Sequence, residues 1–176
     1  MISLPKKEID RAAEVFADGF MEDPAFSLLL KDTPSGKALL QQYFLDYLIS
    51  CKELLLYKCS EAGEGYLCLY RHDTTFADFA VPKPLATLEE FQMIDEFYHS
   101  EYAVLDIMAV ERTSRGKGLA GEMIDFFVAY CQQNKLLPLV EVFSRQHIAL
   151  YLAHGFAVAH CRTHRDITTY ILEYQE

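Results

Sequence analysis

An apolar run, Val104–Val110, is followed by a short polar loop at 111–115 and then by a long segment with helical periodicity, 116–134. The run is interrupted only by Asp106 and has the length of a buried strand. In the long segment, apolar residues recur at spacings of three and four, which places them on one face of a helix. These residues are Leu119, Met123, Phe127, Tyr130 and Cys131. A buried strand leading directly into a helix predicts a mixed α/β fold.

The rest of the sequence alternates between helical and strand patterns, with no repeat and no low-complexity tract. The predicted helices are 6–20, one beginning near Ser35, one beginning near Thr87, and His147–His154. The predicted strands are Leu54–Cys59, Tyr66–Tyr70, Leu137–Phe143, 156–163 and 166–174. We expect one mixed α/β domain over 1–176.

Several boundaries of these elements carry local signals. Asp23-Pro24 is expected to end the first helix, and Thr87 with Glu90 resembles a capping box for the third. The third helix should bury Phe91, Ile94, Phe97 and Tyr98. The glycine-containing segment 61–65 should join the first two strands as a hairpin, and Gly155 should close the last helix in a left-handed conformation.

The loop between the central strand and helix has the character of an anion site. A helix N-terminus presents unpaired N–H groups and the positive end of a dipole, and glycines at 116 and 118 let the backbone approach a ligand. Arg112, Arg115 and Lys117 add three cations within six residues. The Walker and dinucleotide-binding patterns both fail to match. The alternative is a glycine-containing turn with surface cations.

The charge balance limits the partners that this chain is expected to have. The formal net charge is -10, from 16 basic and 26 acidic residues. Such a field repels polyanions, so no nucleic-acid partner is expected, and it attracts cations such as amines. The alternative is that the excess acid only maintains solubility.

The cysteines and the termini indicate the expected compartment. The five cysteines form no C-x-x-C pair, which argues against a disulfide framework or a metal site and favours reduced thiols. The N-terminus lacks the apolar core of a signal peptide, and no apolar stretch reaches the length of a membrane span. We expect a cytoplasmic protein with no membrane partner.

Four segments resemble motifs of the GNAT superfamily of N-acetyltransferases. The resemblance in the central and C-terminal segments covers about 102–160 of the chain. The resembling segments are Arg115-x-x-Gly118-x-Ala120 after a strand-ending Val110, the strand Pro138–Glu141, Tyr151-x-x-x-Gly155-Phe156, and Gly19–Pro24, which is similar to an A-F-x-x-D-P start found in small-molecule members. The resemblance implies a central mixed, mostly antiparallel sheet flanked by helices.

The resemblance also implies acetyl-CoA as co-substrate, with no metal. Amides of the glycine loop would bind the pyrophosphate: Arg115, Gly116, Lys117, Gly118, Leu119 and Ala120. Backbone groups around Ile107, Met108 and Val110 would hold the pantetheine arm. His147 stands where many members have an Asn that contacts the pantetheine, and Arg112 where a Pro is common.

Catalytic roles follow from the same resemblance. Tyr151 would be the general acid that protonates the leaving thiolate, the alternative being a helix residue that only packs on the core. Glu141 would be the general base that removes the proton of the amine. Asp106, Glu101 and His99 are weaker candidates for the base, and a chain of bound waters is a further alternative.

The acceptor would be a primary amine of a small molecule or peptide. Side chains expected to line its pocket are Phe20, Phe26, Tyr43 and Tyr47. Members of the family are frequently dimers, so a homodimer remains open. Two other functions compete with this one: a non-catalytic acyl-CoA-binding or regulatory domain, and a nucleic-acid-modifying acetyltransferase, which the charge disfavours.

Overall fold

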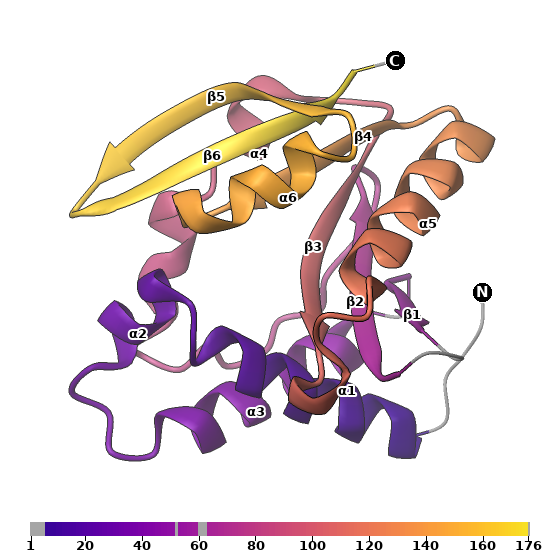
Figure 1. The fold of residues 1–176 in the computed structure, drawn as a ribbon. Coiled ribbons are helices and arrows are strands. Elements are labelled where there is room, and N and C mark those ends of the chain that lie inside the picture. Colours follow the sequence, from indigo (N-terminus) through magenta and orange to yellow (C-terminus); the bar gives the residue numbers. More distant parts are fainter. Residues whose placement is uncertain (1–5, 52, 60–62, 176) are drawn as a thin grey trace.

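A computed structural model describes residues 6–51, 53–59 and 63–175. Six strands form one sheet in the order β1-β2-β3-β4-β6-β5 (Figure 1). The strands are β1 Leu55–Lys58, β2 Gly65–Arg71, β3 Tyr102–Val110, β4 Leu137–Val142, β5 Phe156–His164 and β6 Ile167–Tyr174. Every neighbouring pair is antiparallel except β3 with β4, which is parallel. The predicted mixed, mostly antiparallel sheet is therefore confirmed.

Helices cover both faces of this sheet. They are α1 Lys6–Phe20, α2 Pro24–Leu30, α3 Gly36–Ser50, α4 Ile94–Phe97, α5 Leu119–Asn134 and α6 Ile148–Leu152, with 3-10 turns at Ala86–Phe91, Arg112–Ser114 and Arg145–His147. Alternate side chains of β2 separate two cores, because successive residues of a strand face opposite ways. Leu67 and Leu69 pack with α5, whereas Tyr66 and Cys68 pack with α1 and α3. No helix in the described part of the chain has the length and apolar character needed to cross a bilayer.

The predicted helix over 6–20 is confirmed, since α1 ends at Phe20, before Asp23-Pro24. The other predicted helices need one addition and one correction. The addition is α2, which begins at Pro24 and was not predicted. Asp23 caps α2, its Oδ1 accepting a hydrogen bond from the Ala25 amide at 2.8 Å, and Pro24 suits the first helical turn.

The helix predicted near Thr87 is instead a 3-10 turn followed by the short α4. Its N-cap is Leu85, with no side-chain capping bond, so the capping box is wrong. The backbone is extended at Gln92 and breaks the helical path. Ile94 is buried as expected, but Phe97 is 45% exposed.

The tip of the hairpin between β1 and β2 was predicted at 61–65, and residues 60–62 lie outside the described residues. The antiparallel pairing on either side of it, from Leu55↔Leu69 to Lys58↔Tyr66, confirms the hairpin itself. The αL conformation predicted for Gly155 is also confirmed, with φ of 86°.

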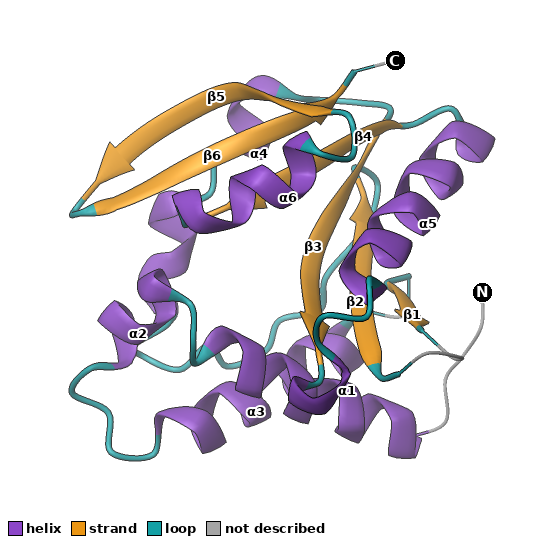
Figure 2. Cartoon of the chain, viewed as in Figure 1, coloured by secondary structure: helices purple, strands orange, loops and turns teal. Residues whose placement is uncertain are grey.

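A β-bulge interrupts β3 at Asp106. Opposite β2, Leu105 pairs with Leu69 and Ile107 pairs with Cys68, so Asp106 is the extra residue. Parallel pairing with β4 runs from Tyr102↔Leu137 to Leu105↔Val140, and no further pair is recorded between the two strands. Figure 2 shows β3 and β4 diverging beyond this point. The bulge thus sits where the sheet opens.

Candidate active site

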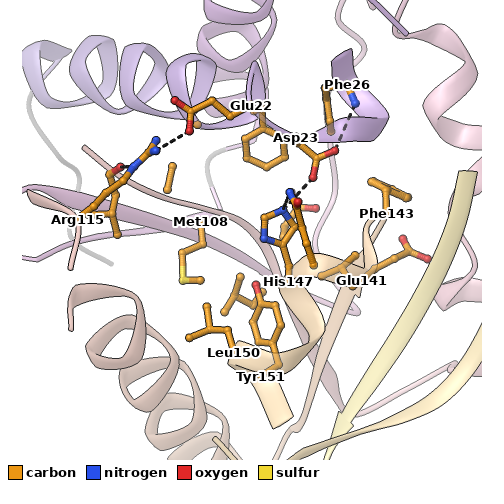
Figure 3. Close-up of a pocket in the computed structure, with 18 residues that line it drawn as sticks. Glu22, Asp23, Phe26, Met108, Arg115, Glu141, Phe143, His147, Leu150 and Tyr151 are labelled. Carbon is orange, nitrogen blue, oxygen red and sulfur yellow. Dashed lines mark hydrogen bonds and ion pairs between the residues drawn. The ribbon is translucent and has the colours of Figure 1, made fainter. Parts of the chain in front are cut away.

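A cavity of about 480 Å³ occupies the opening between β3 and β4. Its walls come from the second half of β3, the end of β4, the segment that joins α1 to α2, and α6 (Figure 3). The predicted site residues that line it are Met108, Val110, Arg115, Glu141, His147 and Tyr151. The fold therefore brings both predicted catalytic side chains to one cavity, which we call the cleft.

Tyr151 lies on α6, and its ring is 6% exposed. The ring packs edge-on against Phe156 with centroids 6.0 Å apart, and the sharp turn at Gly155 connects the two residues. Its hydroxyl points into the cleft beside Met108 (Figure 3). No described residue hydrogen-bonds to this hydroxyl, and burial raises the pKa of Tyr151. The phenol is thus protonated at neutral pH and free to donate.

Glu141 lies on β4 and is half-buried. Its Oε1 accepts a hydrogen bond from the Met93 amide at 2.7 Å, which orients the carboxyl group. Burial raises the pKa of Glu141 to about 8, and the neighbouring charges of Asp106 and Asp95 contribute to this rise. Such a group exchanges a proton near physiological pH, as a general base should.

Asp106, the bulge residue, lies in the wall that the cleft shares with a second cavity. The Tyr47 hydroxyl on α3 donates a hydrogen bond to its Oδ2 at 2.5 Å. Burial raises the pKa of Asp106 to about 6, and the hydrogen bond from Tyr47 partly offsets this effect. A buried carboxylate needs a hydrogen-bond donor, and Tyr47 supplies one.

The glycine loop forms a third cavity of about 620 Å³ at the start of α5. Gly116 and Gly118 have φ of 76° and 83°, and a Cβ added at either would meet no atom within 4 Å. Gly118 is the N-cap of α5 and provides no side-chain cap for the N–H groups of the first turn. Leu119 and Ala120 also line this cavity. The open space and unpaired donors fit a diphosphate.

Two cations of the loop pair with Glu22, in the segment that joins α1 to α2. Glu22, just after α1, accepts hydrogen bonds from Arg112 Nη2 and Arg115 Nη1, both at 2.5 Å. Figure 3 shows the Arg115 pair at the edge of the cleft. Lys117 is exposed and lines neither the cleft nor the loop cavity.

His147 faces the cleft from the turn that precedes α6. Its Nε2 lies 3.1 Å from Asp23 Oδ2, so Asp23 contacts the cleft and caps α2 at the same time (Figure 3). Ile107 lies on the other face of β3, where its side chain lines the second cavity. Any contact of Ile107 with a ligand in the cleft is therefore restricted to its backbone.

Two weaker candidates for the base lie elsewhere. Glu101 and His99 lie just before β3, at the opposite end of that strand from the part that lines the cleft, and neither is among the residues of the cleft. The direction of β3 explains this, because residues that enter a strand cannot reach the end where the sheet opens. Neither residue remains a candidate.

Sequence reasoning missed Glu22, Asp23 and Met93 as parts of the site. In the sequence, Glu22-Asp23-Pro24 stands out only as a helix boundary and as part of the A-F-x-x-D-P resemblance. No sequence signal marks Glu22, because its partners Arg112 and Arg115 are 90 and 93 positions away along the chain and become neighbours only in the fold. The Met93 amide could not be found from the sequence either, since its role depends on a break in helical structure. Among the described residues, no group of three or more His, Cys, Asp or Glu is arranged to hold a metal ion.

The four predicted acceptor-pocket residues, Phe20, Phe26, Tyr43 and Tyr47, all line the second cavity. Phe20 and Phe26 also line the cleft, with ring centroids 4.8 Å apart. The second cavity therefore adjoins the cleft through shared walls.

Comparison with known proteins supports the fold and leaves the sequence family open. No protein-family model matches the chain, and no curated protein matches it in sequence. Many solved structures match it, however, including acetyltransferases described as members of the GNAT family.

Three of these structures illustrate the likeness. The C-terminal condensation domain of Ebony, solved with β-alanyl-dopamine, has a TM-score of 0.75 and 10% identity, covering 98% of this chain and 97% of that one. A putative arylalkylamine N-acetyltransferase 7 of the yellow fever mosquito has a TM-score of 0.66 and 13% identity, covering 97% and 84%. The PaiA N-acetyltransferase of Thermoplasma acidophilum, solved with coenzyme A, has a TM-score of 0.59 and 10% identity, covering 99% and 97%. At these identities the likeness shows that the chain has the GNAT fold.

Proposed function

We propose that this protein is an N-acetyltransferase that takes an acetyl group from acetyl-CoA and transfers it to a primary amine of a small molecule or peptide. One observation carries the proposal. The cleft between β3 and β4 contains the Tyr151 hydroxyl and the Glu141 carboxyl group, and it shares Val110 and Arg115 with the glycine-loop cavity. An anion site and two proton-transfer groups thus adjoin one opening, as acyl transfer from a diphosphate-bearing donor requires.

The residues present fit the coenzyme. Backbone amides from Arg115 to Ala120 would bind its diphosphate, because the loop is open and the first turn of α5 has no side-chain cap. Backbone groups of Met108 and Val110, in the part of β3 that no longer pairs with β4, would hold the pantetheine arm. His147 would contribute one hydrogen bond at the same wall.

Bound acetyl-CoA would supply an activated thioester carbonyl for direct attack by the amine, giving an amide and a free thiol. Glu141 accepts the proton that the amine nitrogen loses as the new C–N bond forms. Its raised pKa makes it a stronger base than an ordinary carboxylate. Tyr151 donates its hydroxyl proton to the sulfur as the C–S bond breaks.

The first test is a thermal unfolding measurement with acetyl-CoA. At about 100 times its dissociation constant, a ligand stabilises the native state by about 2.7 kcal/mol, which for a domain of this size raises the Tm by roughly 5–10 °C. A rise that is larger for acetyl-CoA than for adenosine supports the coenzyme site. If the Tm does not rise with acetyl-CoA, the glycine loop is only a turn and the proposal is refuted.

The second test separates an enzyme from a non-catalytic acyl-CoA-binding domain. We expect Tyr151→Phe to lower kcat for thiol release by about 10²–10⁴-fold with the acetyl-CoA affinity unchanged. Tyr174→Phe is the matched control, because Tyr174 also packs on Phe156, at 5.4 Å, but lies outside the cleft. Full turnover in Tyr151→Phe would refute the general-acid role, and coenzyme binding without turnover of any amine would favour the binding domain.

A further inference from the structure

The second cavity, which we call the aromatic chamber, has a volume of about 400 Å³ and lies between α3, β2 and the segment 72–92. Ten of its 20 lining residues are Phe or Tyr. They are Phe20, Phe26, Tyr43, Phe44, Tyr47, Tyr70, Phe76, Phe79, Tyr102 and Phe143. Its size is within the range of pockets that enclose a small organic molecule, and so many rings favour an aromatic ligand.

The rings are held in place by one another. Tyr47 stacks on Phe76 with centroids 5.4 Å apart, and Tyr70 meets the same Phe76 edge-on at 5.7 Å. Tyr43 approaches Phe79 at 5.8 Å. Because these contacts join α3, β2 and the loop after β2, the chamber has walls that are formed before any ligand enters.

The charges of the chamber favour a cationic ligand. Asp106 and Asp95 are two carboxylates in its wall. Its one Arg, Arg71, is already paired with Asp73 outside the lining, through two contacts of 3.0 Å. Aromatic faces also attract an ammonium group through their quadrupoles.

Asp106 connects the chamber to the cleft, because it is the one carboxylate that lines both. The bulge in β3 places it there, at the point where pairing with β4 ends. Tyr47 donates a hydrogen bond to Oδ2, which leaves Oδ1 to accept from a ligand. An amine held by Oδ1 would lie at the boundary between the chamber and the cleft.

We propose that the aromatic chamber is the acceptor site and takes an arylalkylamine, whose ring lies among Tyr47, Phe76 and Phe79 and whose amino group binds Asp106. This inference rests on the proposed function for the fate of the amine, whereas binding itself does not require the coenzyme. Asp106 then fixes the position of the amine nitrogen, and Glu141 in the adjoining cleft remains the proton acceptor.

The test is equilibrium binding of tryptamine to the free protein, followed by indole fluorescence. The chain contains no Trp, so tryptamine is the only indole in the sample. We expect a blue-shifted emission and saturable binding. Phenethylamine should displace the probe at much lower concentration than hexylamine, and 3-phenylpropionate, which has a carboxylate instead of the amine, should not displace it. Equal displacement by hexylamine and phenethylamine, or displacement by the anion, would overturn the assignment.

Two variants locate the probe. Asp106→Asn should weaken tryptamine binding by about ten- to a hundredfold, the range for losing one hydrogen bond between charged groups. Its amide oxygen can still accept from Tyr47. Asp95→Asn is the matched control, because Asp95 lines the same chamber but accepts from Tyr102 at 2.9 Å and does not line the cleft. Unchanged tryptamine affinity in Asp106→Asn, or an equal loss in Asp95→Asn, would refute the role of Asp106.

The acetyl-CoA thermal shift, measured on the same variants, separates the two proposals. A shift in Asp106→Asn like that of the parent protein, together with lost tryptamine binding, shows a folded protein and supports the acceptor site. Tryptamine binding that depends on Asp106 in a protein without any acetyl-CoA shift would support the chamber while refuting the acetyltransferase. An acetyl-CoA shift without tryptamine binding would refute the chamber alone.

Discussion

Replacing Glu22 by Gln should tighten coenzyme binding. In the structure Glu22 bridges Arg112 and Arg115 at the rim of the cleft, and both arginines belong to the glycine loop. These two cations hold the pKa of Glu22 below its usual range, through their hydrogen bonds to its carboxylate. A diphosphate bound at the loop must compete with this carboxylate for Arg115.

The size of the effect follows from the exposure of the pair. Arg115 and Glu22 are 40% and 42% exposed, so their ion pair belongs to the class that contributes about 0.2–1 kcal/mol. Gln keeps the side-chain length and removes the competing charge. We therefore expect the Kd for coenzyme A to fall by up to about fivefold, with a larger change at low ionic strength.

Isothermal titration calorimetry at two salt concentrations measures this effect. Glu14→Gln is the matched control, because it removes the same charge from a half-exposed pair, Arg11–Glu14 at 2.6 Å, that lies outside the cleft. A Kd that is unchanged or higher in Glu22→Gln would refute the competition. An equal gain in Glu14→Gln would assign the effect to net charge instead.

Two further predictions concern Glu141 and Gly155. With Glu141 as the base, kcat/KM should rise with pH to a plateau above its pKa of about 8, and Glu141→Gln should lose this limb in a pH–rate profile. Burial in the folded protein disfavours the ionised form of Glu141. The free energy of unfolding should therefore fall as the pH rises from 4.5, the ordinary pKa, to about 8. Glu141→Gln should therefore gain stability relative to the parent across that window, by on the order of a few kcal/mol in urea titrations; a constant difference would contradict the raised pKa. Gly155→Ala should lower the free energy of unfolding by about 2–3 kcal/mol, because φ is 86° and the new Cβ would lie 2.9 Å from Tyr174. Gly116→Ala is the control, with φ of 76° and no contact, and should lose only about 1–2 kcal/mol; equal losses would show that Tyr174 moves aside.

Local sequence patterns predicted the elements whose buried face can be recognised from the spacing of their own apolar residues. The spacing of Leu119, Met123, Phe127 and Cys131 predicted α5, and all four are buried. Tyr151 and Glu141, which the GNAT-like motifs singled out, both line the cleft. Periodicity and short motifs suffice where an element buries a face that its own sequence defines.

Features that depend on a distant partner could not be anticipated. The bulge at Asp106 exists because β2 and β3 change register between Cys68 and Leu69, and neither strand alone signals it. The Glu22 bridge joins residues that are 93 positions apart, as in its pair with Arg115. The break at Gln92, which frees the Met93 amide for Glu141, is likewise set by tertiary packing that overrides helix propensity.

The short parallel seam between β3 and β4 has a mechanical consequence. Four matched positions, Tyr102–Leu105 opposite Leu137–Val140, make the whole hydrogen-bonded joint between β1–β3 and β4–β6 in the described sheet. Beyond this joint, the part of β3 from Asp106 to Val110 is paired with β2 but not with β4, and it extends about 16 Å at the usual rise per residue. A rotation of about 5° at the seam would therefore move the end of this part by about 1.5 Å. A substitution that repacks the side chains around the seam should therefore change the distance between β3 and β4 in the cleft, well away from the substituted residue.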